Sequence, residues 1–335
     1  MNILIGVISI AAAFGVSLAL ARHFSNPAAR LQILDHPNAR SLHTQPTSRA
    51  GGIAIVGGVL VGMLVLVSWV PWSNDFMWVA AALVMVAGIS LWDDLYGANI
   101  AIRLFLHLGG ALFVLQTGVG VGASPDIWPL SAWLSLPITM VFILWMINLY
   151  NFMDGMDGMA GGMAVFGFTF IAALSWHAHL YSFAVASGVV AAASLGFLVL
   201  NFAPARIFMG DVGSATLGLL AGVFSLAGAH LGAFPLWAAI LIFSPFIVDA
   251  TLTLIRRLFR GEAVWQAHRT HYYQRLVQMG WGHRKTALYA YVLMATCGVS
   301  AVIAVRLTPA GQWSVLGAWF LIYVVIVRWI DARAH

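Results

Sequence analysis

The sequence predicts an all-α integral membrane protein, with residues 1–335 forming a single domain of about eleven transmembrane helices. Of the 335 residues, 61% are apolar and only 8% are charged, whereas an average soluble domain has about 25% charged residues. So few charges cannot cover a water-facing surface of this size, which excludes a soluble globular protein. The apolar content also excludes a disordered chain, because disordered chains are poor in apolar residues.

Eleven apolar runs have the length of a membrane-spanning helix, which needs about 20 mostly apolar residues. The predicted spans are 3–21, 52–71, 77–92, 104–121, 130–149, 158–176, 180–200, 212–231, 235–255, 287–305 and 313–330. The first run has neither a charged segment before it nor a convincing cleavage site. We therefore expect it to be a retained span rather than a signal peptide.

The cationic side chains indicate which face of the membrane is cytoplasmic. With eleven spans, fifteen of the sixteen Lys and Arg side chains fall on one face or at its edge, and only Arg306 falls on the other. The positive-inside rule makes the cation-rich face cytoplasmic, with the N-terminus outside and the C-terminus inside. The net charge of +5 is thus a topology signal, and no soluble basic domain is present to bind nucleic acid.

Acidic residues are scarce, and each one in a membrane protein calls for an explanation. The chain has ten Asp and one Glu. Six of these acids fall at the inner ends of spans, in four segments: Asp93, Asp94, Asp154, Asp157, Asp211 and Asp249. A solvated helix end is the alternative for the adjacent pair Asp93 and Asp94, because neighbouring carboxylates repel each other unless a cation or a basic group holds them.

Asn148, Asn151, Asp154 and Asp157 recur at every third position between the fifth and sixth predicted spans. On a helical turn this spacing aligns hydrogen-bonding groups along one side, and the intervening glycines let the backbone approach a ligand. A calcium-binding loop is a poor match because no bidentate Glu follows. A purely structural role as helix caps would leave two carboxylates at membrane depth unexplained.

The segment 201–214 leads from the seventh predicted span into the eighth. It carries Asn201, Arg206, Phe208 and Asp211, followed by Gly213 and Ser214. Glycines and a hydroxyl at a helix N-terminus suit a bound oxyanion, although Asp211 could instead serve only as an N-cap. We expect a shared metal and phosphate site here.

Two cytoplasmic loops add cations. His268, Arg269 and His271 lie in the last long loop, where no cysteine completes a zinc site and a phosphate-binding role fits better. Arg40 and His43 lie in the first long loop, where cations and glycines precede a span; this is a weaker sign of a phosphate contact. We expect five segments to form the site: 22–51, 93–103, 150–157, 201–211 and 256–286.

Carboxylates beside Arg and His are typical of phosphoryl chemistry that uses Mg²⁺, for which Mn²⁺ is a possible substitute. The position of the acids at the inner membrane surface indicates one lipid substrate and one from the cytosol. A secondary transporter is the competing interpretation, but transporters place charges near the bilayer midplane and often contain repeated halves. The acids of this chain lie at one face, and the sequence has no internal repeat.

In order and composition, Asp93-Asp94, the Asn148–Gly162 segment and the Asn201–Ser214 segment resemble the motifs of the polyprenyl-phosphate N-acetylhexosamine-1-phosphate transferases. The resemblance covers about residues 35–285, and eleven spans are similar to the O-antigen-initiating branch. It implies transfer of an N-acetylhexosamine-1-phosphate from a UDP-sugar to undecaprenyl phosphate, with release of UMP. It also implies a bacterial inner-membrane location, with a periplasmic N-terminus and a cytoplasmic site, and it leaves open a homodimer.

The resemblance assigns roles by position. Asp211 would bind Mg²⁺, with Asp94 as a second metal ligand. The predicted catalytic residues are Asp93, Asp94, Asp154, His268 and His271. The predicted substrate-binding residues are Asn148, Asn151, Asp157, Asn201, Phe208, Arg206, Arg269, Arg40 and His43.

Two departures from the family pattern concern the donor sugar. Ser41 stands where the family often has Lys, and His268-Arg269-Thr270-His271 replaces the common His-x-His-His. The latter is similar to initiators that use 6-deoxy-N-acetylhexosamines, so the sequence predicts GlcNAc or a 6-deoxy relative, FucNAc or QuiNAc, as the transferred sugar.

Overall fold

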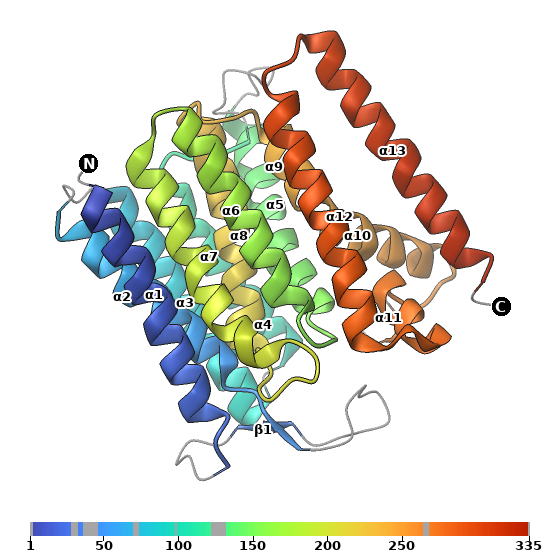
Figure 1. Ribbon diagram of the computed structural model, residues 1–335, viewed down its shortest axis with the longest axis horizontal. Helices are drawn as coiled ribbons and strands as arrows, with labels where there is room; N and C mark the ends of the chain where they lie inside the picture. Colours follow the sequence, from blue (N-terminus) through green and yellow to red (C-terminus); the bar gives the residue numbers. More distant parts are fainter. Residues whose placement is uncertain are drawn as a thin grey trace.

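The computed structural model describes residues 3–27, 33–35, 46–69, 74–97, 99–121, 132–263 and 268–333, which form a bundle of long helices (Figure 1). The first half of the chain contains α1 (Ile3–Phe24), β1 (Leu34–Asp35), β2 (Thr47–Ser48), α2 (Gly51–Val67), α3 (Asn74–Tyr96), α4 (Ile100–Leu115) and α5 (Ala132–Met153). The second half contains α6 (Met159–His177), α7 (Tyr181–Asn201), α8 (Gly210–His230), α9 (Leu236–Ile242), α10 (Ser244–Phe259), α11 (Tyr272–Leu276), a π-helical turn (Val277–Trp281), α12 (Gly282–Ala304) and α13 (Pro309–Asp331).

Eight of the described helices are long and apolar enough to cross a membrane, and the bent pair α9–α10 brings the number to nine. The apolar helices α2 and α4 are shorter. Each predicted span coincides with one of these helices or with the bent pair, so the prediction of an all-α, multi-pass membrane protein is confirmed. The count of eleven crossings and the sides of the two termini stay predictions.

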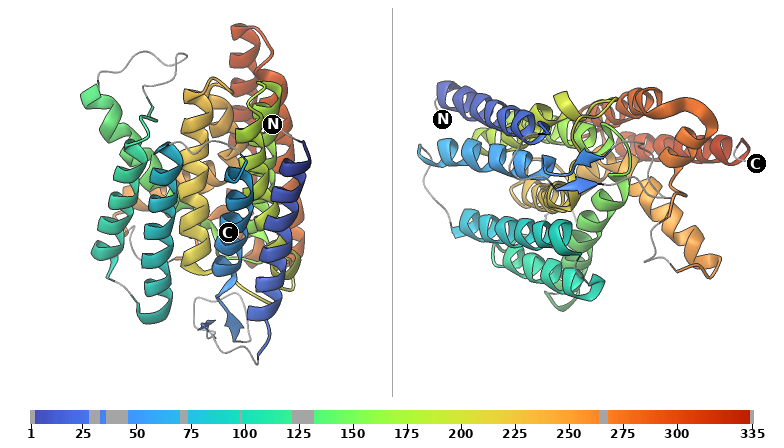
Figure 2. Two further views of the ribbon diagram at one scale, coloured as in Figure 1. Left: turned by 90° about the vertical axis from the view of Figure 1, so that its left-hand side faces the viewer. Right: turned by 90° about the horizontal axis from the view of Figure 1, so that it is seen from below.

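The span predicted at 235–255 is two helices rather than one, because α9 and α10 meet at 78°. Pro245 has no backbone N–H, so it cannot donate to the carbonyl of Leu241 as an uninterrupted helix would require. The hydroxyl of Ser244 donates to that carbonyl instead, over 2.7 Å. The bend sends α10 away from the rest of the bundle, as the view from below shows (Figure 2, right).

Helix α8 is the central helix, and 94% of its most apolar stretch is buried. It packs against α2, α3, α5 and α6. Its sequence is rich in Gly, Ala and Ser, and small residues let neighbouring membrane helices approach closely. Because α8 begins at the end of the bundle where α3 and α5 finish, its N-terminus lies beside the acids that end those two helices.

The first long loop is tied to the N-terminus of α8 through a short hairpin, which the sequence did not predict. Strands β1 and β2 pair antiparallel at the lower end of the bundle in Figure 1. The N–H of Phe208 donates to the carbonyl of Ser48 over 2.7 Å, and the N–H of Gly51 donates to the carbonyl of Phe208 over 3.0 Å. Two of the predicted binding residues, Arg40 and His43, lie outside the described residues.

Candidate active site

The carboxylate of Asp94 caps the N-terminus of α8. Its two oxygens accept from the backbone N–H groups of Asp211 and Val212, each over 3.2 Å. Gly210 has a φ of +69°, and a Cβ at this position would lie 2.8 Å from Asp94 Oδ2. Glycine is therefore required both by the backbone conformation and by the approach of the carboxylate. The positive end of the α8 dipole stabilises the negative charge of the Asp94 carboxylate.

Arg103, in the first turn of α4, links two of the predicted acids. Its Nη1 lies 2.9 Å from Asp93 Oδ2 and 3.1 Å from Asp211 Oδ2. The other oxygen of Asp211 accepts from Asn151 Nδ2 over 2.8 Å, and the same amide contacts Ser214 Oγ at 3.1 Å. Helices α4 and α5 thus hold the side chain of Asp211 in one orientation, and Asp93 of α3 in turn holds Arg103.

Asp154 lies just beyond the C-terminus of α5, outside the spans, and its half-buried carboxyl has no hydrogen-bond or ion-pair partner among the described residues. Burial, reinforced by the negative charges of Asp211, Asp94 and Asp157, raises the pKa of Asp154 well above its usual value. Like charges this close disfavour ionisation unless a cation offsets them. This part of the site therefore has an excess of negative charge.

The acid cluster, defined as Asp93, Asp94, Asp154, Asp157 and Asp211, suits a hard divalent cation. No three His, Cys, Asp or Glu side chains in the described parts of the chain are placed to enclose a metal ion by themselves. Magnesium commonly binds through one or two carboxylates together with substrate phosphates. The unpartnered carboxyl of Asp154 beside Asp211 fits that mode, whereas a closed, all-protein cage is not formed.

A second set of contacts joins the loop after α5 to the loop before α8. Asn201 Oδ1 accepts from the N–H of Gly158 over 3.0 Å, and its Nδ2 donates to the carbonyl of Ile207 over 2.9 Å. Asp157 Oδ2 accepts from the N–H of Ala205 over 3.0 Å. The two loops are therefore held side by side next to the acid cluster.

The sixth inner acid, Asp249 on α10, lies apart from these carboxylate contacts and caps α11. Its oxygens accept from the N–H groups of Tyr272 and Tyr273 over 2.9 and 3.0 Å. His271 Nδ1 lies 3.3 Å from Asp249 Oδ1, and its ring stacks on Phe152. The side chain of His271 is 3% exposed, so it is held beneath the surface.

His268 is neutral in this arrangement. Its Nδ1 is 3.4 Å from the backbone N–H of Thr270 and 2.9 Å from the Thr270 hydroxyl. A backbone N–H can only donate, so Nδ1 is the acceptor and the ring hydrogen is on Nε2. Burial, together with the positive charges of His271 and Arg257, lowers the pKa of His268 to about 4.

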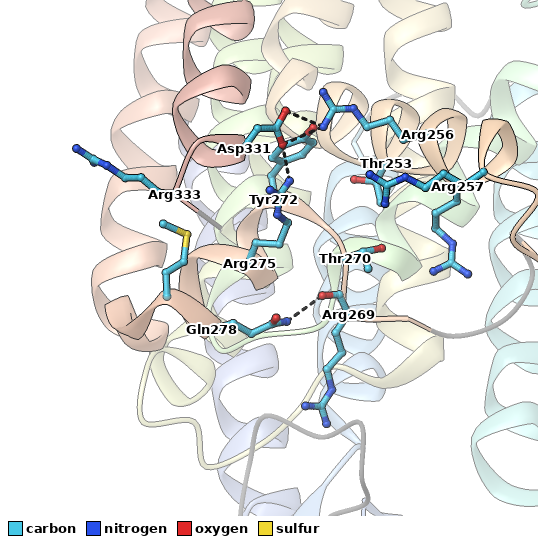
Figure 3. Close-up of a pocket in the computed structure, with 12 residues that line it drawn as sticks. Thr253, Arg256, Arg257, Arg269, Thr270, Tyr272, Arg275, Gln278, Asp331 and Arg333 are labelled. Carbon is cyan, nitrogen blue, oxygen red and sulfur yellow. Dashed lines mark hydrogen bonds and ion pairs between the residues drawn. The ribbon is translucent and has the colours of Figure 1, made fainter. Parts of the chain in front are cut away.

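Three further predicted residues have other surroundings. Asn148 donates to the carbonyl of Leu144 in its own helix. Its amide therefore does not donate to the acids as that of Asn151 does. Arg206 is exposed on the loop before α8. Arg269 lines a cavity of about 770 Å³ beside α10 and α13 (Figure 3). The roles predicted for these residues stay predictions.

Three residues with direct contacts to the predicted acids were not singled out from the sequence, although each lies in a segment predicted to form the site. They are Arg103, His283, which lies 3.0 Å from Asp157, and Arg49, which lies 3.8 Å from Asp94. Arg103 had a signal that could have revealed it, because a cation inside an apolar helix needs a counter-ion. His283 follows a break in the helix at Gly282, and nothing in its local sequence distinguishes it.

Comparison with known proteins agrees with these motifs. Residues 76–229 match the sequence model of glycosyl transferase family 4. The chain is 31% identical to a probable undecaprenyl-phosphate N-acetylglucosaminyl 1-phosphate transferase of Bacillus subtilis, over 96% of this chain and 90% of the relative. It is 28% identical to a decaprenyl-phosphate N-acetylglucosaminephosphotransferase of Mycolicibacterium smegmatis, over 93% and 86%. It is 25% identical to an undecaprenyl-phosphate alpha-N-acetylglucosaminyl 1-phosphate transferase of Escherichia coli K12, over 82% and 78%.

Proposed function

Because the chain belongs to glycosyl transferase family 4, among the polyprenyl-phosphate N-acetylhexosamine-1-phosphate transferases, we propose that it transfers an N-acetylhexosamine-1-phosphate from a UDP-sugar to undecaprenyl phosphate. The products are UMP and a lipid-linked pyrophosphoryl sugar, from which O-antigen or a related envelope glycan would be built. We place the reaction at the cytoplasmic face of a bacterial inner membrane, on the basis of the cation distribution.

One observation carries this proposal. The carboxyl of Asp154 has no partner among the described residues, and the charges of three other acids at the same end of the bundle oppose its ionisation. A transporter would need such charges near the middle of the bilayer. An enzyme that joins two phosphates at the membrane surface needs them at a helix end, where a cation and phosphate oxygens can neutralise them.

The reaction forms a P–O bond between an oxygen of the lipid phosphate and the β-phosphorus of the UDP-sugar, and it breaks the P–O bond to the α-phosphate, which leaves as UMP. A phosphate monoester is already largely dianionic at pH 7, because its second pKa is about 6. The attacking group therefore needs little deprotonation, and the main requirements are neutralisation of charge and alignment.

Mg²⁺, or Mn²⁺ in its place, held by Asp211 with Asp154 or Asp94, would offset the negative charge of the two phosphates. The chain's own residues supply the alignment. Arg103 and Asn151 orient the Asp211 carboxylate. Asn201 and Asp157 join the two loops that we assign to the nucleotide.

The donor sugar is proposed to be an N-acetylhexosamine, with UDP-GlcNAc as the first candidate because the relatives described above are named for N-acetylglucosamine. A 6-deoxy donor is the second candidate, since Arg269 and Thr270 interrupt the usual histidine motif. Turnover of UDP-GlcNAc equal to or better than that of UDP-FucNAc and UDP-QuiNAc would exclude the 6-deoxy preference.

The deciding experiment incubates the purified full chain with Mg²⁺, undecaprenyl phosphate and each UDP-sugar, and follows UMP. We expect UMP only when both substrates are present. Absence of UMP with every donor would refute the transferase assignment.

Asp211→Asn is the matching variant for the site, and it should abolish turnover while the protein elutes as the folded wild type does. Asp75→Asn is the control, because Asp75 is exposed in the first turn of α3, at the far end of the bundle. It should retain activity. Turnover in Asp211→Asn would remove Asp211 from the metal site.

A further inference from the structure

A cavity of about 770 Å³ lies outside the acid cluster, between α10, α11 and the C-terminal end of α13 (Figure 3). Guanidinium groups dominate its wall. The arginines that line it are Arg256, Arg257, Arg260, Arg269, Arg275 and Arg333. None of the five acids of the cluster is among its lining residues, although Arg269 and Thr270 of the loop that contains His268 and His271 are. We call it the arginine cavity.

The arginine cavity has a large excess of positive charge. Asp331 is the single acid that lines it within the described residues, and Glu262 pairs with Arg257 at 3.1 Å. With Arg269 left out of the count, the other five arginines face these two acids, which leaves an excess of three positive charges among the described lining residues. Arg260 is exposed and has no ion-pair partner in the described ranges. A concave surface with one sign of charge concentrates the field and attracts counter-ions.

Two of the guanidinium groups are already fixed in position. Nη1 of Arg256 and Nη1 of Arg275 both bind Asp331, at 2.9 and 2.8 Å, as Figure 3 shows. Both guanidiniums also lie over the ring of Tyr272, at 5.4 and 5.0 Å from its centroid. Each guanidinium has five N–H donors, so contacts through one nitrogen leave others for an anion. Such fixed, forked donors are suited to phosphate.

A second, apolar cavity of about 310 Å³ adjoins the arginine cavity. Its wall comes from α10, α11, α12 and α13, including Leu293, Ile326 and Trp329. Tyr272 lines both cavities. A cationic space next to an apolar space between spans matches a ligand with a phosphate head and a hydrocarbon chain.

We propose that these two cavities bind one anionic phospholipid of the surrounding bilayer, with its phosphate among the arginines of the arginine cavity and one acyl chain between α10, α12 and α13. The site joins α13 to α10 and α11 through the lipid as well as through Asp331. His271 is the residue that precedes α11. An occupied site would therefore also hold in place the loop that contains His268 and His271.

The test uses the purified full chain in detergent and native mass spectrometry. The protein is titrated separately with phosphatidylglycerol and with phosphatidylcholine of identical acyl chains, and the bound fraction is counted. We expect phosphatidylglycerol to bind roughly tenfold or more tightly, because each basic residue near the surface favours an anionic lipid. Equal binding of the two lipids would overturn the proposal.

Paired variants locate the site. Arg260→Gln combined with Arg333→Gln removes two exposed cations of the cavity and should abolish the preference for phosphatidylglycerol. Arg328→Gln is the matched control, because Arg328 is exposed on the same helix α13 but does not line the cavity. It should keep the preference. Retained preference in the double variant, or equal loss in the control, would show that the arginine cavity is not the site.

Competition distinguishes the possible sources of the phosphate group. Inorganic phosphate should displace little phosphatidylglycerol, because it cannot occupy the apolar cavity. Complete displacement by millimolar inorganic phosphate would assign the cavity to a soluble anion, against the proposal. Preferential displacement by undecaprenyl phosphate would assign it to the substrate lipid, which also contradicts a bilayer phospholipid.

Discussion

The carboxylate of Asp94 accepts a hydrogen bond from the backbone N–H of Asp211 over 3.2 Å, so one predicted active-site acid fixes the position of another. The two residues are 117 positions apart in the chain, on α3 and α8. Asp94 therefore acts as the N-terminal cap of α8, and Asp211 stands in the first turn of the helix that Asp94 stabilises. The proposed catalytic role of this pair and its structural role cannot be separated by one substitution.

The variants Asp94→Ala and Asp94→Asn should therefore differ from each other more in stability than in activity. Asp94→Ala removes both acceptors and should lower the free energy of unfolding by about 1–2 kcal/mol, as loss of an N-cap does. Asp94→Asn keeps one acceptor oxygen and should cost about half as much. Both should lower UMP release by about 100-fold or more, because the charge near the phosphates is lost. Thermal unfolding in detergent and the UMP assay measure the two effects. An unchanged melting temperature in Asp94→Ala would contradict the capping role.

Arg103→Gln should destabilise the protein most when divalent cations are absent. The substitution leaves Asp93 and Asp211 next to each other without the guanidinium that now lies 2.9 and 3.1 Å from them. Removing one partner of a charge network leaves uncompensated charge, at a cost reduced here by the 25% exposure of Arg103. We expect a lower melting temperature in EDTA and a larger recovery with Mg²⁺ than the wild type shows. The measurement is thermal unfolding with EDTA and with Mg²⁺.

Arg22→Gln provides the control for that experiment, because Arg22 is exposed in the last turn of α1. It removes the same charge without affecting an acid pair. If its response to Mg²⁺ equals that of Arg103→Gln, the recovery does not come from the acid cluster.

Composition and hydropathy predicted most of the fold, because a helix in lipid must satisfy its backbone internally and so extends through the whole apolar run. The bend at Ser244 was not predicted. Pro245 lies in an otherwise apolar stretch that has the length of one membrane span, so hydropathy alone indicates a single helix. The β1–β2 hairpin was not predicted either. Its pairing depends on contacts with Phe208, 160 positions beyond Ser48, and such distant contacts leave no local signal.

For the site, the scarcity of acids indicated which residues to consider, because charge at membrane depth requires a reason. The scarcity of acids could not indicate which partners each acid would contact. Asp249 was grouped with Asp211 only as one of six acids at the inner ends of spans, and the structure shows that it caps α11 rather than contacting Arg103. The difference arises from the bend before α10, which is a tertiary feature. The sequence identified His271 as a candidate site residue. It could not predict that His271 would contact Asp249, because that contact depends on the bend.

The thermal stability of the protein should depend on pH through His268. Its pKa in the folded protein is about 4, against 6.5 for an ordinary histidine. Between these two values the unfolded state binds more protons than the folded state, so stability falls as the pH is lowered from about 6.5 toward 4. His268→Asn keeps an acceptor for the Thr270 N–H but does not titrate. The melting temperature of this variant should therefore decrease less than that of the wild type between pH 7.5 and pH 5. Parallel curves would show that His268 titrates normally.

His283 should act on the donor substrate through Asp157. His283 Nδ1 lies 3.0 Å from Asp157 Oδ1, and the other oxygen of Asp157 accepts from the N–H of Ala205 over 3.0 Å. These two contacts fix the carboxylate next to the loop proposed to bind the nucleotide. His283→Ala frees one oxygen, so we expect KM for the UDP-sugar to rise about 3- to 10-fold, the size of effect that loss of one ordinary hydrogen bond has, because His283 acts on the substrate only through Asp157. We expect little change in kcat. The backbone N–H of Asp157 also lies 3.5 Å from His283 Nδ1. His283→Asn, whose amide can both donate and accept, should restore part of the KM.

A control at the opposite end of the bundle distinguishes this effect from general destabilisation. His230 is exposed in the last turn of α8, and His230→Ala should leave both constants unchanged. The measurement is the rate of UMP release at varied UDP-sugar and saturating undecaprenyl phosphate. A fall in kcat at constant KM would mean that His283 contacts the reacting phosphates itself, because an interaction made only in the transition state changes kcat rather than ground-state binding.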